Sequence, residues 1–162
     1  MTAFPPLDAT PIWARVNDQL VELLGLLPED KLDWSPKRGL WNAKGILLHV
    51  CLGRGIVAHL VPDGEPWPDM LREGQTKEGL QSMLRVSWQR MEPFLRDAQA
   101  LAREYDVPYQ EQTLRLSGHW LVFGQLEHDI HHRADIVRYL DELGIAHPEP
   151  DVIEGRLREL LG

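Results

Sequence analysis

Apolar residues recur three and four positions apart over most of the chain, which is the spacing that places them on one face of an α-helix. The pattern predicts four long helices, at residues 11–27, 42–61, 76–105 and 117–143. A residue suited to capping a helix stands at the start of each, and these residues are Thr10, Asn42, Thr76 and Ser117. Four amphipathic helices of this length favour an all-α, four-helix bundle.

Two interruptions qualify this pattern. Pro93 lies inside the third helix, where proline removes a hydrogen bond, so we expect a kink near Glu92 or two abutting helices. Residues 106–118 lose the helical spacing, and although residues 113–116 alternate, a lone strand would have no partner. A short C-terminal helix is expected from Asp151, and residues 1–162 are expected to form one domain. The spacing leaves the directions of the helices open.

Composition narrows the class of partner and the cellular compartment. The formal net charge of −8 argues against nucleic acid or an anionic membrane as a partner, and it leaves a small-molecule substrate as the expected one. Cys51 is the only cysteine, which excludes an internal disulfide and fits a reducing cytoplasm; we interpret it as a small core residue. No signal peptide is recognised at the start, and the most apolar stretch, residues 45–61, is short for a membrane span.

Histidines are concentrated in residues 125–135, which contain His128, His131 and His132. His128 and His132 stand four apart and therefore share one face of a helix. A mostly neutral imidazole offers a nitrogen lone pair to a metal, but a zinc site needs at least three protein ligands. His49 is the candidate for the third, because the helical wheel places it in the stripe of Gly45, Ile46, Leu52, Gly53 and Ile56, which we expect to face inward.

The last long helix has two faces. His128 and His132 share one face with Leu121, Gln125, Asp135 and Tyr139, and the opposite side carries Phe123, Leu126, Ile130 and Val137. In one interpretation the histidines point to solvent and only the apolar side meets the core. In the other both faces are covered, one by the bundle and one by a second subunit. Periodicity does not decide between them.

Two segments resemble the signatures of the DinB/YfiT-like family. The first is Leu-Asp-Trp-Ser-Pro at residues 32–36, followed by Gly39, Trp41-Asn42 and residues 46–49; the second is residues 127–136. The resemblance implies a bundle of DinB type, commonly a homodimer, in which a histidine of the second helix and an H-x-x-x-H pair of the fourth bind a divalent metal. Those residues are His49, His128 and His132 in this chain. Ala134-Asp135 departs from the more usual Gly-Gln.

The resemblance also implies a function, because the family includes metal-dependent thiol transferases that use mycothiol, bacillithiol or glutathione, and a maleylpyruvate isomerase. Three neutral imidazoles would leave a bound ion its full charge and an open position, which lowers the pKa of a bound thiol or water. The first hypothesis is a thiol-dependent S-transferase acting on a small electrophile, or a metal-assisted hydrolase, with zinc as the expected ion and nickel or iron as alternatives. A low-molecular-weight thiol would be its cosubstrate. The alternatives are a stress-related protein that binds metal or a small molecule without turnover, and a structural bundle with incidental histidines.

Other polar residues on the histidine face have two interpretations each. Asp135 could orient the imidazole of His132, which we favour, or act as a fourth ligand. His131 is expected at the rim or as a hydrogen-bond partner, and Tyr139 is expected to be packed rather than to present its hydroxyl. The tryptophans are expected to anchor the core and the loops.

Overall fold

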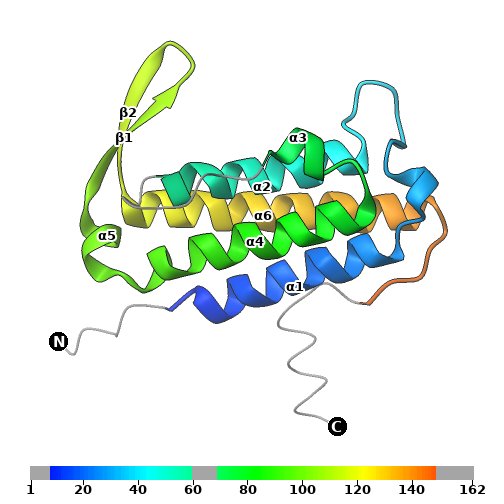
Figure 1. Cartoon of the computed structure of the whole chain (residues 1–162), viewed down its shortest axis with the longest axis horizontal. Helices are drawn as coiled ribbons and strands as arrows, with labels where there is room; N and C mark the ends of the chain where they lie inside the picture. The colour runs from blue at the N-terminus through cyan, green and yellow to red at the C-terminus, as the bar shows by residue number, and fades with distance from the viewer. Residues whose placement is uncertain (1–7, 60–68, 149–162) are drawn as a thin grey trace, which may run out of the picture.

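Four long helices form a bundle in the computed structural model, which describes residues 8–59 and 69–148 (Figure 1). The long helices are α1 (Thr10–Leu26), α2 (Ala43–His59), α4 (Lys77–Arg96) and α6 (Gly118–Glu142). The shorter elements are η1 (Glu29–Lys31), α3 (Met70–Glu73), α5 (Ala98–Ala102), β1 (Glu104–Tyr109) and β2 (Gln112–Ser117). The predicted C-terminal helix lies outside the described residues.

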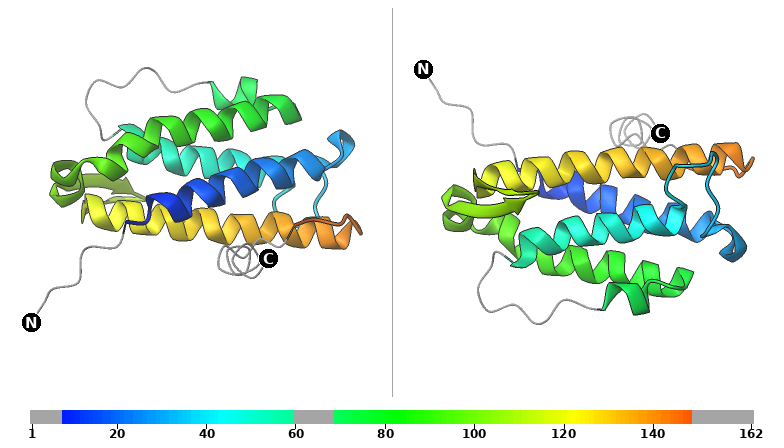
Figure 2. Two further views of the ribbon diagram at one scale, coloured as in Figure 1. Left: turned by 90° about the horizontal axis from the view of Figure 1, so that it is seen from below. Right: turned by 90° about the horizontal axis from the view of Figure 1, so that it is seen from above.

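The long helices do not simply alternate in direction. α1 and α6 run one way and α2 and α4 the other (Figure 1). α1 and α2 each pack against both α4 and α6 (Figure 2). The two helices that carry the candidate histidines, α2 and α6, are therefore antiparallel neighbours.

The core forms where the apolar stripes of the helices meet. Leu20 of α1, Leu47 of α2 and Leu84 of α4 are completely buried, and each such side chain contributes roughly 1.5–3 kcal/mol through its removal from water. Ile136 and Leu140 bring α6 into the same cluster. Among the described residues, no helix is both long and apolar enough to cross a membrane.

Three of the four predicted helix caps are confirmed. Asn42, Thr76 and Ser117 each accept the backbone N–H three residues further on, at 2.7, 3.1 and 3.4 Å. The cap predicted for α1 is wrong, because Thr10 already belongs to the helix. Its N–H donates instead to the Asp8 carboxylate at 2.9 Å, so the acidic residue two positions earlier satisfies this donor.

The region around Pro93 forms two abutting helices, one of the two predicted arrangements. α4 continues past Pro93 to Arg96, and the chain turns at Asp97. The Asp97 carboxylate accepts two backbone N–H groups of α5, at 2.9 and 3.0 Å. The break thus falls after the proline, where a capping residue can begin a new helix.

A β-hairpin corrects the prediction that residues 113–116 have no strand partner. β1 and β2 pair antiparallel, from Glu104 opposite Ser117 to Tyr109 opposite Gln112, and the hairpin projects from one end of the bundle (Figure 1). Pro108 lies within β1, and the turn residue Gln110 adopts a positive φ of 55° without being glycine or asparagine. Because β2 is largely exposed, the alternation of residues 113–116 marks no buried face and did not indicate a partner strand.

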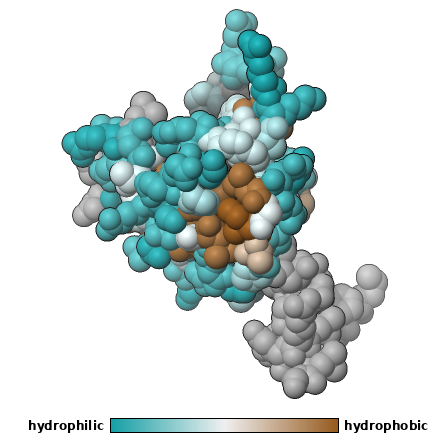
Figure 3. Space-filling model, turned by 90° about the vertical axis from the view of Figure 1, so that its right-hand side faces the viewer, coloured by the Kyte–Doolittle hydropathy of each residue, from teal (hydrophilic) through white to brown (hydrophobic). Residues whose placement is uncertain are grey.

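The opposite end of the bundle exposes an apolar patch ringed by hydrophilic residues (Figure 3). α1 ends there with Leu26, and the connection from η1 to α2 lies at the same end (Figure 1). That connection carries Leu40 and Trp41, two further exposed apolar residues.

Candidate metal centre

The structure brings together the three histidines that the sequence analysis selected. His49 extends from α2, and His128 and His132 extend from successive turns of α6. The ring centroids of His49 lie 4.6 Å from His128 and 5.2 Å from His132, and those of His128 and His132 lie 4.5 Å apart. One potential ligand nitrogen from each ring lies within 4.8 Å of the other two.

The face of α2 that was expected to point inward is only partly buried. Leu52 and Ile56 are 52% and 53% exposed, so this part of the prediction is wrong. The core contacts come from the other side of the helix, where Val50 and Cys51 are buried. His49 lies at the border of the buried side, and that border faces α6.

The histidine face of α6 is covered and part of its apolar side is exposed, although Leu126 and Val137 of that side pack against the core. Phe123 is 60% exposed and Ile130 is also exposed, whereas His128 and His132 are largely covered. The interpretation in which the histidines point to solvent is therefore wrong, and the histidine face turns toward α2.

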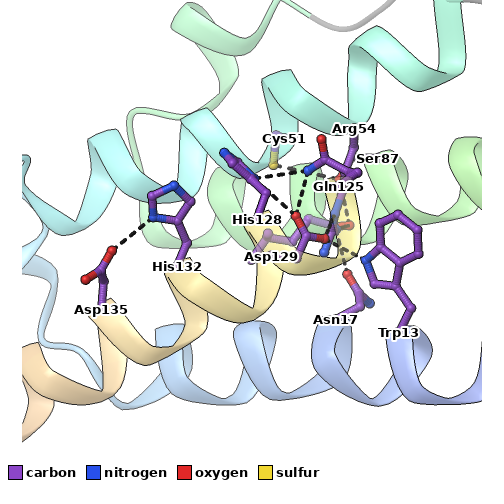
Figure 4. A network of polar contacts seen from close by, with 11 residues as sticks. Trp13, Asn17, Cys51, Arg54, Ser87, Gln125, His128, Asp129, His132 and Asp135 are labelled. Atoms are coloured by element: carbon purple, nitrogen blue, oxygen red, sulfur yellow. Dashed lines mark hydrogen bonds and ion pairs between the residues drawn. The ribbon is translucent and has the colours of Figure 1, made fainter. Parts of the chain in front are cut away.

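Asp135 lies against His132 (Figure 4). The Nδ1 atom of His132 is 3.0 Å from Oδ2 of Asp135, so an Nδ1–H group can donate to this carboxylate and leave the lone pair on Nε2. The other carboxylate oxygen accepts a hydrogen bond from Arg138. This geometry agrees with an orienting role for Asp135 rather than with a fourth ligand.

His131 lies at the rim of the histidine cluster. Its side chain is 69% exposed, and its Nε2 atom is 3.6 Å from the Asp135 carboxylate. His131, His132 and Asp135 form a second group whose potential ligand atoms are within 4.8 Å of one another. That group comes from one helix, and its carboxylate already has partners. The three-histidine group, which joins two helices, is the better candidate.

Burial favours the neutral forms of His49 and His132. It lowers the pKa of His49, and the neighbouring imidazoles of His128 and His132 lower it further. Burial also lowers the pKa of His132 by more than its hydrogen bond to the Asp135 carboxylate raises it. Both rings therefore favour the uncharged form that can donate a lone pair to a metal.

A buried ion pair lies directly beneath the histidines, and the sequence analysis missed it. Arg54 of α2 and Asp129 of α6 are both completely buried, with Nε of Arg54 2.8 Å from the Asp129 carboxylate. The indole N–H of Trp13 donates to the same oxygen at 2.7 Å. Burial would raise the pKa of Asp129, but the charge of Arg54 and the hydrogen bonds to the carboxylate hold it below its usual value.

Arg54 also reaches the other two long helices. Its Nη1 atom donates to Asn17 of α1 at 2.9 Å and to the backbone carbonyl of Leu84 in α4 at 3.1 Å. The ion pair thus joins all four long helices. A charged residue in the apolar sequence of α2 was the available signal, because a buried charge needs a partner.

Gln125 connects this ion pair to the histidine cluster (Figure 4). Its amide nitrogen donates to Oδ1 of Asp129 at 2.8 Å and lies 3.1 Å from Nδ1 of His128. Gly53 of α2 makes room for it, since a β-carbon at that position would lie 2.6 Å from the Gln125 amide oxygen. The Nδ1 atom of His128 is therefore in contact with a hydrogen-bond network that is anchored in the core.

Trp41 covers one side of the cluster, although the tryptophans were expected to anchor core and loops. Its ring meets His49 edge to face at a centroid distance of 4.6 Å and lies nearly parallel to His132 at 6.5 Å. The ring is 53% exposed. The Tyr139 hydroxyl donates to the backbone carbonyl of Trp41 at 2.5 Å, so Tyr139 is packed, as expected, and its hydroxyl is already used.

Comparison with a protein-family model identifies the family of this chain. The model of the DinB family matches residues 9–156, which is most of the chain. The chain belongs to the DinB family. A search of curated proteins finds no match to this DinB protein.

Solved structures share the fold of this DinB protein at low sequence identity. The DinB-like protein YjoA from Bacillus subtilis is 16% identical with a TM-score of 0.68, covering 90% of this chain and 99% of its own. A DinB-like protein from Bacillus cereus is 15% identical with a TM-score of 0.64, covering 86% and 93%. YfiT from Bacillus subtilis, described as a probable metal-dependent hydrolase with an unusual four-helix bundle topology, is 16% identical with a TM-score of 0.59, covering 88% and 95%.

The donor set of this DinB protein fits a divalent transition metal. Imidazole nitrogens suit zinc, nickel, copper and iron, whereas magnesium and calcium prefer oxygen ligands. Three ligands from the protein would leave a coordination position for another molecule, as in catalytic zinc sites.

Proposed function

We propose that this DinB protein is a metal-dependent enzyme in which His49, His128 and His132 hold one divalent ion, with zinc as the first choice. The observation that carries the proposal is the convergence of three largely buried imidazoles from two helices, with one nitrogen of each within 4.8 Å of the others. Imidazoles that converge beside the core lose hydrogen bonds to water. This costs free energy unless they bind a common ligand.

We further propose that the reaction transfers a low-molecular-weight thiol to a small electrophile. A divalent ion with three imidazole ligands supplies a positive charge that lowers the pKa of a thiol or water in its open position. Within the described residues, the chain's own thiol is unsuited to be the nucleophile, because Cys51 is buried and burial raises its pKa to about 11. The nucleophile would therefore come from solution.

The chain's own residues would position the ligands. Asp135 would hold Nδ1 of His132 so that Nε2 points into the cluster. Gln125, which is fixed by Asp129, would restrict the ring of His128. Trp41 would exclude water from one side of the imidazoles.

Metal analysis of untagged protein, purified without added metal, tests the ligand set. We expect about one divalent ion per chain, as three-ligand sites hold, and loss of that ion in His49→Ala. His131→Ala is the matched control. It removes a histidine of the other group, His131, His132 and Asp135, and should leave the metal content unchanged. A protein that contains no metal and also fails to bind added zinc or nickel would contradict the proposal.

A metal-assisted hydrolase is the second candidate, favoured by the fold likeness to YfiT. The metal-loaded protein should be assayed with small electrophiles in the presence and absence of low-molecular-weight thiols, and with activated esters and amides. Thiol-dependent consumption of the electrophile supports the transferase, and thiol-independent hydrolysis supports the second candidate. Metal binding without turnover in either assay would favour a binding protein.

A further inference from the structure

A groove opens beside His49 where α2 begins. Its volume is about 500 Å³, and it is lined by Leu40, Trp41, Gly45, Leu48 and Leu52 together with His49. Pockets for small molecules in proteins commonly have volumes of about 300–1,000 Å³. The groove is thus of a size to receive a small organic molecule.

Most of the side chains that line the groove are apolar. It contains no aspartate, glutamate, lysine or arginine, and the remaining lining residue is Asn42. The Asn42 side chain already accepts from the N–H of Gly45 at 2.7 Å and donates to Asp33 at 3.3 Å. Apart from the His49 imidazole and the Trp41 indole N–H, the groove therefore offers mainly apolar side chains, and none that is charged.

The groove is continuous with the histidine cluster. His49 belongs to both, and the ring of Trp41 lines the groove while it contacts His49 and faces His132. The hydrogen bond from Tyr139 to the Trp41 carbonyl ties this wall to α6. Gly45 leaves space in the groove, because a β-carbon there would lie 3.0 Å from the Asn42 side chain.

Leu40, Trp41 and Leu52 are each about half exposed around this opening. Large apolar side chains left in contact with water gain free energy when an apolar surface covers them. Because the groove has the size of a small-molecule pocket and shares His49 with the histidine cluster, a small molecule is the occupant that the geometry favours over a second copy of the chain.

We propose that this groove binds the uncharged alkyl or aryl part of the molecule whose reactive group reaches His49, His128 and His132. The inference rests on the proposed function and names its substrate class: small, apolar and without charge at the end remote from the reactive group. Molecules of the same size whose remote part carries a positive or negative charge are excluded as substrates. The described lining has no charged side chain to pair with them.

Metal-free protein and benzyl alcohol test the groove independently of the metal. Benzyl alcohol should shift the indole N–H resonance of Trp41 in ¹H–¹⁵N spectra, with that resonance assigned from Trp41→Phe. Benzoate and benzylammonium should bind at least about tenfold more weakly, because a charge in an apolar groove is desolvated without a partner. Equal binding of the three probes would overturn the proposal.

Two aspartate substitutions on α2 form a matched pair. Leu52 lines the groove and Ile56 does not, yet they are equally exposed on the same helix. Leu52→Asp should weaken benzyl alcohol binding about tenfold, whereas Ile56→Asp should leave it unchanged. Equal losses in both variants would overturn the groove. So would a Leu52→Asp protein that dissociates into monomers while it keeps full affinity for benzyl alcohol, because the groove would then serve a second copy.

Zinc-loaded protein links the groove to the reaction. Along the series ethanethiol, propanethiol and butanethiol, affinity should rise about two- to fourfold per methylene, the gain expected for a methylene that is wholly or partly buried. Equal affinities for the three thiols, with metal binding intact, would overturn the proposed role of the groove and leave the metal site standing. Absence of metal together with retained benzyl alcohol binding would overturn the proposed function alone.

Discussion

At the residue scale, the metal-site residues and the ion pair beneath them differ in how far the sequence could predict them. The histidines were found because His128 and His132 share a helical face and because the helical wheel of the second helix singled out His49, which the family resemblance also implies. Arg54 and Asp129 are 75 residues apart, and no spacing rule joins residues on different helices. Their pairing required the helix directions, which the sequence left open.

We predict that Asp129→Asn destabilises the protein by about 3–5 kcal/mol, because it leaves the charge of Arg54 buried without a counterion. Asp33→Asn is the control: the Asp33 side chain is 69% exposed in its ion pair with Lys44, so solvent screens the pair and its loss should cost less than about 1 kcal/mol. Urea denaturation of the metal-free proteins measures both. Adding Arg54→Met to Asp129→Asn should recover part of the loss; no recovery would show that the stranded charge is not its cause.

Cys51 should resist alkylation in the native protein. With a pKa of about 11 and no exposed surface, only roughly 0.1% of the thiol is ionised at pH 8, and the reagent cannot reach it. Intact-mass spectrometry after treatment with iodoacetamide should show unmodified native protein and complete modification after unfolding in urea. Rapid labelling of the folded chain would contradict the burial of this thiol.

At the scale of elements, the sequence predicted the four long helices because the apolar period is clear along each of them, and three of the four predicted caps are confirmed. It assigned the wrong face to α2 and left two interpretations open for α6, because both helices carry apolar residues on an exposed side, such as Leu52 and Phe123. A helical wheel cannot distinguish an exposed apolar residue from an apolar residue of the core. The hairpin was missed because neither its turn nor the largely exposed β2 carries a strong signal.

Two glycines of α6 should respond to alanine in opposite directions. A β-carbon at Gly118 would lie 2.3 Å from the backbone oxygen of Ala100, where α5 meets α6, whereas nothing lies within 4 Å of one at Gly124. We expect Gly118→Ala to destabilise by about 1–3 kcal/mol and Gly124→Ala to stabilise by roughly 0.5–1 kcal/mol. Thermal and chemical denaturation measure the signs. Stabilisation by Gly118→Ala would contradict the close approach of the two helices.

At the scale of the whole molecule, we propose that the chain forms a homodimer through the outer face of α6. Trp120 and Phe123 are 64% and 60% exposed there, and their rings contact each other at a centroid distance of 5.9 Å. Exposed aromatic pairs of this kind mark interaction surfaces. Phe123 belongs to the apolar side of α6 that the sequence analysis placed opposite the histidines.

Phe123→Asp should therefore convert a dimer into a monomer in sedimentation experiments, without loss of metal, since this side chain points away from the histidines. Leu114→Asp, which alters an exposed apolar residue of the hairpin, should leave the dimer intact. A wild-type protein that sediments as a monomer at high concentration would contradict the proposal.

The buried ion pair also has a consequence for the order of assembly. Arg54 and Asp129 join α2 to α6 one layer deeper than the histidines, and they do so without a metal. Folding must close this long chain segment to form the pair, which is a slow, non-local step. The histidines are then already in place, so metal should enter a finished bundle. Chelation should remove the ion and leave the helices folded, and the speed of metal uptake should be independent of the speed of folding.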